Sequence, residues 1–152
     1  MSTVGIVSGG FDPIHIGHIE YIRDARFRSD FLVVGVNSDE WLQRKKGYVF
    51  QSLRDRKAII SNLKCVDYTY SFDDSDGSAS DLILRVIDTL GPDNEYVFMN
   101  GGDRTQANIP EMNLNLSHKI PNLKFEFGIG GNDKLNSSSS LVERFRSHVQ
   151  SA

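Results

Sequence analysis

The chain has 152 residues, with 17 lysines and arginines against 20 aspartates and glutamates, which gives a formal net charge of −3. This acidic balance argues against a nucleic-acid partner, because a surface that neutralises phosphates is normally basic, and no apolar run reaches the roughly 18 to 20 residues of a membrane span. The single cysteine, Cys65, excludes an intramolecular disulfide, so we expect one cytoplasmic domain, residues 1–152, with no membrane partner.

Apolar segments of strand length alternate with segments of helical spacing along the chain. In chain order, the pattern predicts a strand at residues 4–7, a helix at 16–25, a strand at 31–36, a short helix from Asp39, a helix at 53–63, a strand at 66–72, a helix at 82–90, a strand at 95–99, a strand at 123–127 and a helix at 141–149. This alternation is typical of a doubly wound α/β fold, with a five-stranded parallel sheet that binds ligands at the carboxyl ends of its strands.

Three polar stretches lack this periodicity. Residues 43–51 are basic and include Lys46, so we expect a mobile loop there. Residues 103–121 predict a loop mixed with a helical turn, and the serines at 137–140 predict the capped start of the last helix. The serine tract is too short to be a linker, and we predict no domain boundary.

The strongest local pattern is Gly-Gly-Phe-Asp-Pro-Ile-His-Ile-Gly-His at residues 9–18, where the first strand passes into the first helix. The paired glycines let backbone approach a ligand closely, and the N-terminus of the following helix offers N–H groups to a phosphate. His15 and His18 are three residues apart, which places both imidazoles on one face of a first helical turn. Both rings can then donate hydrogen bonds to one anionic group, and Gly17 between them leaves the path to it open.

The segment resembles the His-x-Gly-His signature of the nucleotidyltransferase superfamily, and more closely its cytidylyltransferase-like branch. Glycerol-3-phosphate cytidylyltransferases and heptose-phosphate adenylyltransferase domains share the pattern glycine-phenylalanine-aspartate-x-x-His-x-Gly-His. Further matches follow in order over most of the chain, at Val36-Asn37-Ser38-Asp39, Lys46-Gly47, Arg56, Val66-Asp67, Gly101-Gly102-Asp103, and Ser137-Ser138-Ser139 with Leu141. The resemblance implies a Rossmann-like sheet with strand order 3-2-1-4-5, and a homodimer.

Enzymes of this family transfer a nucleoside monophosphate from a nucleoside triphosphate to a phosphorylated acceptor and release pyrophosphate. The resemblance implies CTP or ATP as donor, a phosphorylated sugar or polyol such as heptose 1-phosphate or glycerol 3-phosphate as acceptor, and Mg²⁺ held mainly by the nucleotide phosphates rather than by the protein. It implies catalytic roles for His15, His18 and Lys46, and acceptor binding for Asp12 and Arg56. Nucleotide binding is implied for Gly9, Gly10, Phe11, Gly17, Gly101, Gly102, Asp103, Ser137, Ser138 and Ser139.

The sequence departs from the family pattern near its end. Cytidylyltransferases usually carry an arginine shortly before the serine element, whereas residues 130–136 offer only Lys134 as a cation, and this weakens the assignment of CTP. An adenylyltransferase acting on phosphopantetheine or nicotinate mononucleotide, and a nucleotide-binding regulatory module without turnover, stay open as alternatives. A class I aminoacyl-tRNA synthetase is disfavoured, because the sequence has neither a Lys-Met-Ser-Lys-Ser segment nor a basic tRNA-binding region.

Overall fold

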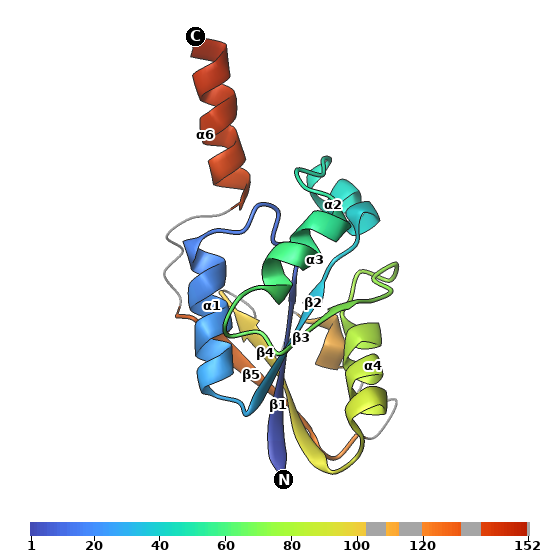
Figure 1. Ribbon diagram of the computed structural model, residues 1–152. Helices are drawn as coiled ribbons and strands as arrows, with labels where there is room; N and C mark the ends of the chain where they lie inside the picture. The colour runs from blue at the N-terminus through green and yellow to red at the C-terminus, as the bar shows by residue number, and fades with distance from the viewer. Residues whose placement is uncertain (103–108, 113–119, 132–137, 152) are drawn as a thin grey trace.

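Five parallel strands form one sheet in the computed structural model, which describes residues 1–102, 109–112, 120–131 and 138–151. The strands are β1 (Ser2–Gly9), β2 (Phe31–Val36), β3 (Tyr68–Ser71), β4 (Asn94–Gly101) and β5 (Leu123–Ile129). Their spatial order is β3-β2-β1-β4-β5, which confirms the doubly wound fold and the predicted strand order (Figure 1). Because β2 and β4 flank β1, the connections change direction at the carboxyl end of β1, where sheets of this kind bind ligands.

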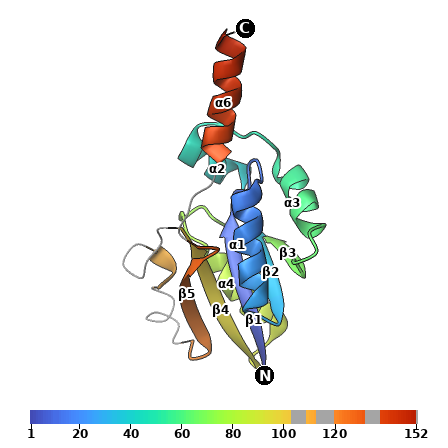
Figure 2. The same cartoon turned by 90° about the vertical axis from the view of Figure 1, so that its left-hand side faces the viewer.

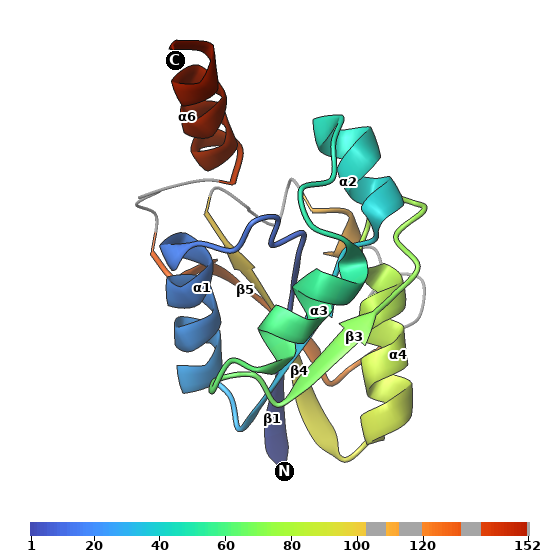
Figure 3. The same ribbon diagram turned by 45° about the horizontal axis from the view of Figure 1, so that its top comes forward.

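Helices cover both faces of the sheet (Figure 1, Figure 3). α1 (Ile16–Phe27) and α3 (Leu53–Ser61) lie on one face, and α4 (Ser80–Leu90) lies on the other. Each face has its own buried core, because alternate side chains of a strand point to opposite faces. The core beneath α1 and α3 includes Val7, Ile22, Val34, Ile60 and Met99. The core beneath α4 includes Ile6, Val33, Leu82, Val86 and Phe98.

The predicted loop at residues 43–51 is wrong over its first half, because the helix α2 (Asp39–Lys46) continues into it. Ser38 caps the start of α2, where its Oγ accepts a hydrogen bond from the Trp41 N–H at 3.0 Å. Gly47 ends the helix in the left-handed conformation, with a φ of 83° that glycine adopts without steric strain. The basic residues that indicated a loop occupy the last turn of α2, where their charge complements the negative end of the helix dipole.

The last helix, α6 (Ser138–Ser151), projects from the carboxyl-end edge of the sheet (Figure 1, Figure 2). Its start is tied to the first motif, because the Ser138 Oγ donates a hydrogen bond to the Pro13 carbonyl at 2.7 Å. Between β4 and β5, the 3-10 turn η1 (Pro110–Met112) confirms the helical turn predicted within residues 103–121. Across the described ranges, no helix is long and apolar enough to cross a membrane.

Candidate active site

His15 and His18 form a reciprocal cap at the start of α1. The Nδ1 of His15 accepts a hydrogen bond from the Gly17 N–H at 3.0 Å, and the Nδ1 of His18 accepts one from the His15 N–H at 3.2 Å. The two imidazoles stack, with centroids 3.9 Å apart and ring planes 28° apart. Because each Nδ1 is an acceptor, a neutral imidazole in either position carries its proton on Nε2. The capping bonds thus set both rings as Nε2–H donors on one face of the helix.

The pKa of His18 is far below its ordinary value. Burial, followed by the charges of His15 and Lys46, lowers the pKa from 6.5 to about 3. Phe11 supports the ring from the side, with its own ring edge-on at a centroid distance of 5.0 Å. His18 is therefore neutral near pH 7, and it still has an Nε2–H to donate to an anion.

The glycine pair makes room for packing inside the protein. A Cβ on Gly9 would lie 3.0 Å from the Phe11 ring, and a Cβ on Gly10 would lie 2.8 Å from the Cδ2 of Leu42 on α2. Phe11 is 3% exposed, with a positive φ of 51°. Its buried side chain leaves only backbone for the nucleotide contact that the family resemblance implies. The glycines bring the motif, α2 and the Phe11 ring together beside the histidine pair.

Asp12 is buried and bonded to backbone. Its two carboxylate oxygens accept hydrogen bonds from the N–H groups of Phe50 and Gln51, at 2.7 and 2.6 Å. Asp12 is 0% exposed, so in this arrangement the side chain offers no surface to an acceptor. Through these two hydrogen bonds, Asp12 holds the segment between α2 and α3 against the motif.

Arg56, the other residue expected to bind the acceptor, is also buried, with a side chain that is 0% exposed. Its guanidinium donates to the Gly10 and Asn37 carbonyls at 2.9 and 2.7 Å, and to the Gln51 carbonyl at 2.9 Å. It also pairs with the Asp39 Oδ1 at 2.6 Å. Arg56 therefore joins the motif, the end of β2 and the start of α2, and any effect on a substrate passes through the backbone that it holds.

Lys46, the last residue of α2, lies in the electrostatic field of the histidine pair, because its charge contributes to the low pKa of His18. Burial lowers the pKa of Lys46 itself, the Asp12 carboxylate raises it, and nearby cations lower it again. Its neighbour Lys45 lies over the Trp41 ring, with Nζ 4.7 Å from the ring centroid. The sequence separates His15 from Lys46 by 31 positions, yet in the folded chain the charge of Lys46 acts on the His18 imidazole.

Tyr21 on α1 supports the carboxyl ends of β4 and β5, and the sequence pattern did not single it out. Its hydroxyl donates to the Met99 carbonyl at 2.6 Å. A Cβ on Gly101 would lie 3.1 Å from the Tyr21 ring, and one on Gly130 would lie 2.9 Å from the Tyr21 Cα. Gly102 follows with a positive φ of 63°. These glycines let both strand ends reach α1 at the same edge as the histidines. A single tyrosine within a helix carries no sequence signal of this role.

The serine element is described in part. Ser138 is buried, and its Oγ donates to the Pro13 carbonyl, so this hydroxyl joins α6 to the motif in the present arrangement. Ser139 lies in the first turn of α6. Asp103 and Ser137, both predicted to contact the nucleotide, lie outside the described residues.

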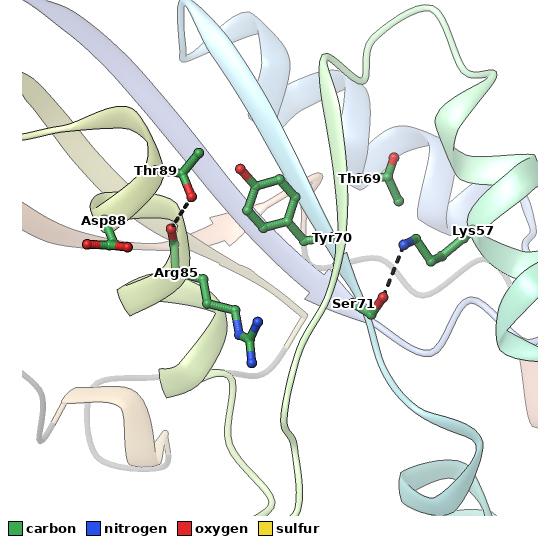
Figure 4. A pocket seen from close by; sticks show the side chains of 7 residues that line it. All are labelled: Lys57, Thr69, Tyr70, Ser71, Arg85, Asp88 and Thr89. Atoms are coloured by element: carbon green, nitrogen blue, oxygen red, sulfur yellow. Dashed lines mark hydrogen bonds between the residues drawn. The ribbon is translucent and has the colours of Figure 1, made fainter.

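A separate hollow of about 390 Å³ lies at the β3 edge of the sheet, and Figure 4 shows its lining. The lining residues are Lys57, Thr69, Tyr70, Ser71, Arg85, Asp88 and Thr89. Lys57 Nζ donates to Ser71 Oγ at 3.0 Å across one side of the strand. No predicted site residue lines this hollow, so the candidate active site remains the edge that carries the histidine pair.

Comparison with known proteins identifies the family of the chain. The sequence profile of cytidylyltransferase-like proteins matches residues 6–142, from β1 into α6. The chain belongs to the cytidylyltransferase-like family. This membership places it among the nucleotidyltransferases and confirms the resemblance on which the site residues were chosen.

Curated relatives of the chain include proteins named Bifunctional protein HldE. The one from Syntrophotalea carbinolica is 38% identical over 109 residues, which cover 70% of this chain and 20% of the relative. The one from Helicobacter pylori strain J99 is 30% identical over 141 residues, which cover 91% of this chain and 27% of the relative. The chain thus spans about a fifth to a quarter of the length of these relatives.

Solved structures share the fold. A lipopolysaccharide core biosynthesis protein from Thermoplasma volcanium is 26% identical, with a TM-score of 0.63 that covers 88% of this chain and 100% of that one. A bifunctional NMN adenylyltransferase/ADP ribose pyrophosphatase from Francisella tularensis has a TM-score of 0.64 at 14% identity, over 95% of this chain and 42% of that one. The second likeness is one of fold alone.

Proposed function

We propose that the chain transfers a nucleoside monophosphate from CTP or ATP to the phosphate of a phosphorylated sugar or polyol. An oxygen of the acceptor phosphate attacks the α-phosphorus of the nucleotide, and the bond from that phosphorus to the departing pyrophosphate breaks. The observation that carries the proposal is the stacked histidine pair, in which both Nδ1 atoms accept backbone N–H groups and both Nε2–H groups become the ring donors. Two such donors at a helix N-terminus suit the charge that develops on the α-phosphate oxygens.

In this mechanism the residues of the chain supply alignment and charge. The acceptor phosphate is already an anion, so the attack needs no general base. His15 and His18 donate to the α-phosphate oxygens, and Lys46 attracts the departing pyrophosphate through its positive charge. Asp12 and Arg56 act on the acceptor through residues 50–51, whose backbone they hold.

Magnesium enters the proposal as an ion carried by the triphosphate. Among the residues that the structure describes, no group of three or more histidine, cysteine, aspartate or glutamate side chains is placed to hold a metal. Both oxygens of Asp12, a carboxylate in the motif itself, accept backbone N–H groups. These residues fit an ion whose ligands are mainly phosphate oxygens and water, and which neutralises phosphate charge.

The comparisons favour a sugar phosphate as acceptor. The Thermoplasma volcanium protein is named a lipopolysaccharide core biosynthesis protein, and a saccharide product agrees with a sugar phosphate as acceptor. ATP is the first donor to test, because residues 130–136 lack the arginine that cytidylyltransferases usually carry there. A homodimer in the cytoplasm completes the proposal, and light scattering on the purified chain tests the dimer.

The test is a pyrophosphate-release assay with Mg²⁺ that crosses ATP and CTP with heptose 1-phosphate, glycerol 3-phosphate, nicotinamide and nicotinate mononucleotides, and phosphopantetheine. Release that depends on a sugar or polyol phosphate supports the proposal. Release with a mononucleotide or phosphopantetheine alone would assign the chain to the alternative adenylyltransferases. Nucleotide binding by calorimetry, with no release from any pair, would favour a regulatory module.

The histidine roles are tested by His15→Asn and His18→Asn. The asparagine Oδ1 keeps an acceptor near the position of Nδ1, and asparagine is a good helix cap, while the Nε2–H is lost. Each variant is expected to lower kcat by about 100-fold or more, with a smaller change in nucleotide affinity. His148→Asn, on the exposed part of α6, is the matched control and should keep kcat. Near-normal turnover in both motif variants would remove the histidine pair from the mechanism.

A further inference from the structure

Asp74 is a buried carboxylate that no step of the proposed reaction uses. It follows β3, is 3% exposed, and accepts three hydrogen bonds from the end of β2. Its Oδ2 accepts from the Asn37 Nδ2 at 3.0 Å and from the Ser38 N–H at 2.8 Å, and its Oδ1 accepts from the Ser38 Oγ at 2.7 Å. The adjacent Asp73 is exposed and bonds to Ser75 within its own loop. Of these two neighbouring aspartates, Asp74 is the one whose side chain bonds to the residues that follow β2.

The contacts of Asp74 hold α2 near both of its ends. Ser38 is the N-cap of α2, so the carboxylate fixes the residue that begins the helix. In the last turn, the Arg44 Nη2 donates to the Asp74 carbonyl at 3.0 Å. A helix of eight residues is too short to be stable by itself, so tertiary contacts decide where it lies.

α2 carries Lys46 and packs on the motif, because a Cβ on Gly10 would lie 2.8 Å from the Cδ2 of Leu42. The N-terminal end of α2 is also linked to the motif, because the Asn37 N–H donates to the Gly9 carbonyl at 2.9 Å. The side chain of Asn37 bonds to Asp74, so one carboxylate contacts both the helix cap and the residue that aligns β2 with the motif. The loop after β3 is thus connected, through Asn37 and Ser38, to the edge of the sheet that carries the candidate active site.

We propose that Asp74 is a positioning residue that holds α2, and with it Lys46, against the glycine turn of the motif that leads to the histidine pair. The inference rests on the proposed role of Lys46 in drawing pyrophosphate. When the Asp74 contacts are weakened, α2 shifts and the Lys46 ammonium leaves the pyrophosphate position. The two imidazoles stay in place, because hydrogen bonds from the backbone N–H groups of His15 and Gly17 hold their rings. The resulting defect is that of Lys46 itself, rather than a general loss of structure.

The activity test is a double-mutant cycle of Asp74→Asn and Lys46→Ala, with Asp73→Asn as the matched control. Asp74→Asn is expected to lower kcat/KM for the triphosphate by about 10- to 100-fold, as small misplacements of catalytic groups do. In the Lys46→Ala background, the same change should cost less than about two-fold, because the two residues act as a unit. Asp73→Asn should leave kcat/KM unchanged in both backgrounds. Additive effects, or an unchanged Asp74→Asn variant, would overturn the proposal.

A second measurement does not depend on turnover. Trp41 lies on α2 and is the one tryptophan in the sequence. Acrylamide quenching of its fluorescence therefore measures how accessible this helix is to solvent. Asp74→Asn should raise the quenching constant, and Asp73→Asn should not. Unchanged quenching in Asp74→Asn would overturn the positioning role even in an active enzyme. Raised quenching in a chain that releases no pyrophosphate would keep Asp74 as the anchor of α2 and remove the proposed function instead.

Ser38→Ala serves as the milder variant where Asp74→Asn does not fold. It removes the Ser38 Oγ bonds to Asp74 and to the Trp41 N–H, and keeps the Ser38 N–H bond. Ser38→Ala is expected to change the same quantities as Asp74→Asn, but by less. The quenching constant should rise, kcat/KM should fall, and the loss of kcat/KM in the Lys46→Ala background should be small. A loss of kcat/KM that is equally large with and without Lys46 would contradict the mechanism.

Discussion

The low pKa of His18 makes the stability of the protein depend on pH in a defined window. The folded-state pKa of about 3 lies below the ordinary 6.5 of the unfolded chain. Between these values the unfolded state binds more protons, so this contribution to the free energy of unfolding falls as the pH drops below 6.5. From about pH 7 to about pH 4.5, one such group removes about 2 to 3 kcal/mol.

The perturbation that isolates this contribution is His18→Asn, because asparagine does not titrate and keeps an acceptor for the His15 N–H. Urea unfolding of both proteins, at about pH 7 and about pH 4.5, gives four free energies of unfolding. The variant loses stability at neutral pH, and its deficit relative to the natural chain should shrink by about 2 to 3 kcal/mol at the lower pH. Taking the difference between the proteins cancels the carboxylates that titrate in both, such as Asp24. Burial raises the pKa of Asp24, but the hydrogen bond from Gly130 and the pairing with Arg28 together outweigh it and lower that pKa.

Two results would refute the reasoning. The first is a stability deficit that stays the same, within about 0.5 kcal/mol, at both pH values. The second comes from nitrogen-15 NMR of the imidazoles, which reads tautomer and charge directly. A His18 ring that carries its proton on Nδ1, or that titrates near 6.5, would contradict the capping geometry and remove the neutral Nε2–H donor from the mechanism.

The remaining predictions concern the residues that hold the site together, and each is measured by urea unfolding. Gly10→Ala places a Cβ 2.8 Å from the Cδ2 of Leu42, whose side chain is buried, and should cost about 1 to 3 kcal/mol. A neutral result would show that the Leu42 side chain moves aside without cost. Arg56→Lys replaces a buried guanidinium that bonds to three carbonyls and Asp39, and should cost about 2 kcal/mol or more. Arg54→Lys, on the exposed side of the same helix, should stay within about 0.5 kcal/mol, and equal costs would contradict the buried role of Arg56. Ser138→Ala loses the bond to Pro13 and should cost about 1 kcal/mol, with faster amide exchange at the start of α6; unchanged exchange there would refute the anchor.

Much of the fold follows from hydrophobic periodicity. All five strands and the long helices lie where apolar spacing predicts them. The central strands and α1, α3 and α4 bury apolar side chains against one another, whereas α6 leaves Phe145 and Val149 exposed. The strand order came from the family resemblance, since periodicity alone does not say which strands pair. The last turn of α2 was missed because its basic residues have no apolar repeat. That turn is stabilised by the helix dipole, by the left-handed Gly47 and by the hydrogen bond from Arg44 to the Asp74 carbonyl.

The candidate site was predictable to a different degree. The spacing of His15 and His18 predicted a shared face, and the structure shows that face. It did not predict that the two rings also cap the helix, because histidine is an uncommon cap and its tautomer depends on backbone contacts. Asp12 shows why the rest was out of reach: its partners at residues 50–51 lie 38 and 39 positions away. A carboxylate in a motif looks the same in sequence whether it binds a ligand or a distant backbone N–H.

Two sets of residues make up the candidate site: those proposed to bind substrate, and buried polar side chains that hold the backbone behind them. This arrangement keeps the site in place although its described residues include neither a metal-binding cluster nor a disulfide. The buried polar side chains around the motif, Asp12, Arg56 and Asp74, bond mainly to backbone groups at the ends of β1 and β2 and beside α2. Groups fixed in this way do not reorganise when charge develops on a phosphate, and this is the condition under which hydrogen-bond donors contribute most to catalysis. A few substrate-binding residues can therefore suffice when many buried contacts hold them in place. Substitutions at Asp74 or Arg56 should change turnover although neither side chain contacts the substrate.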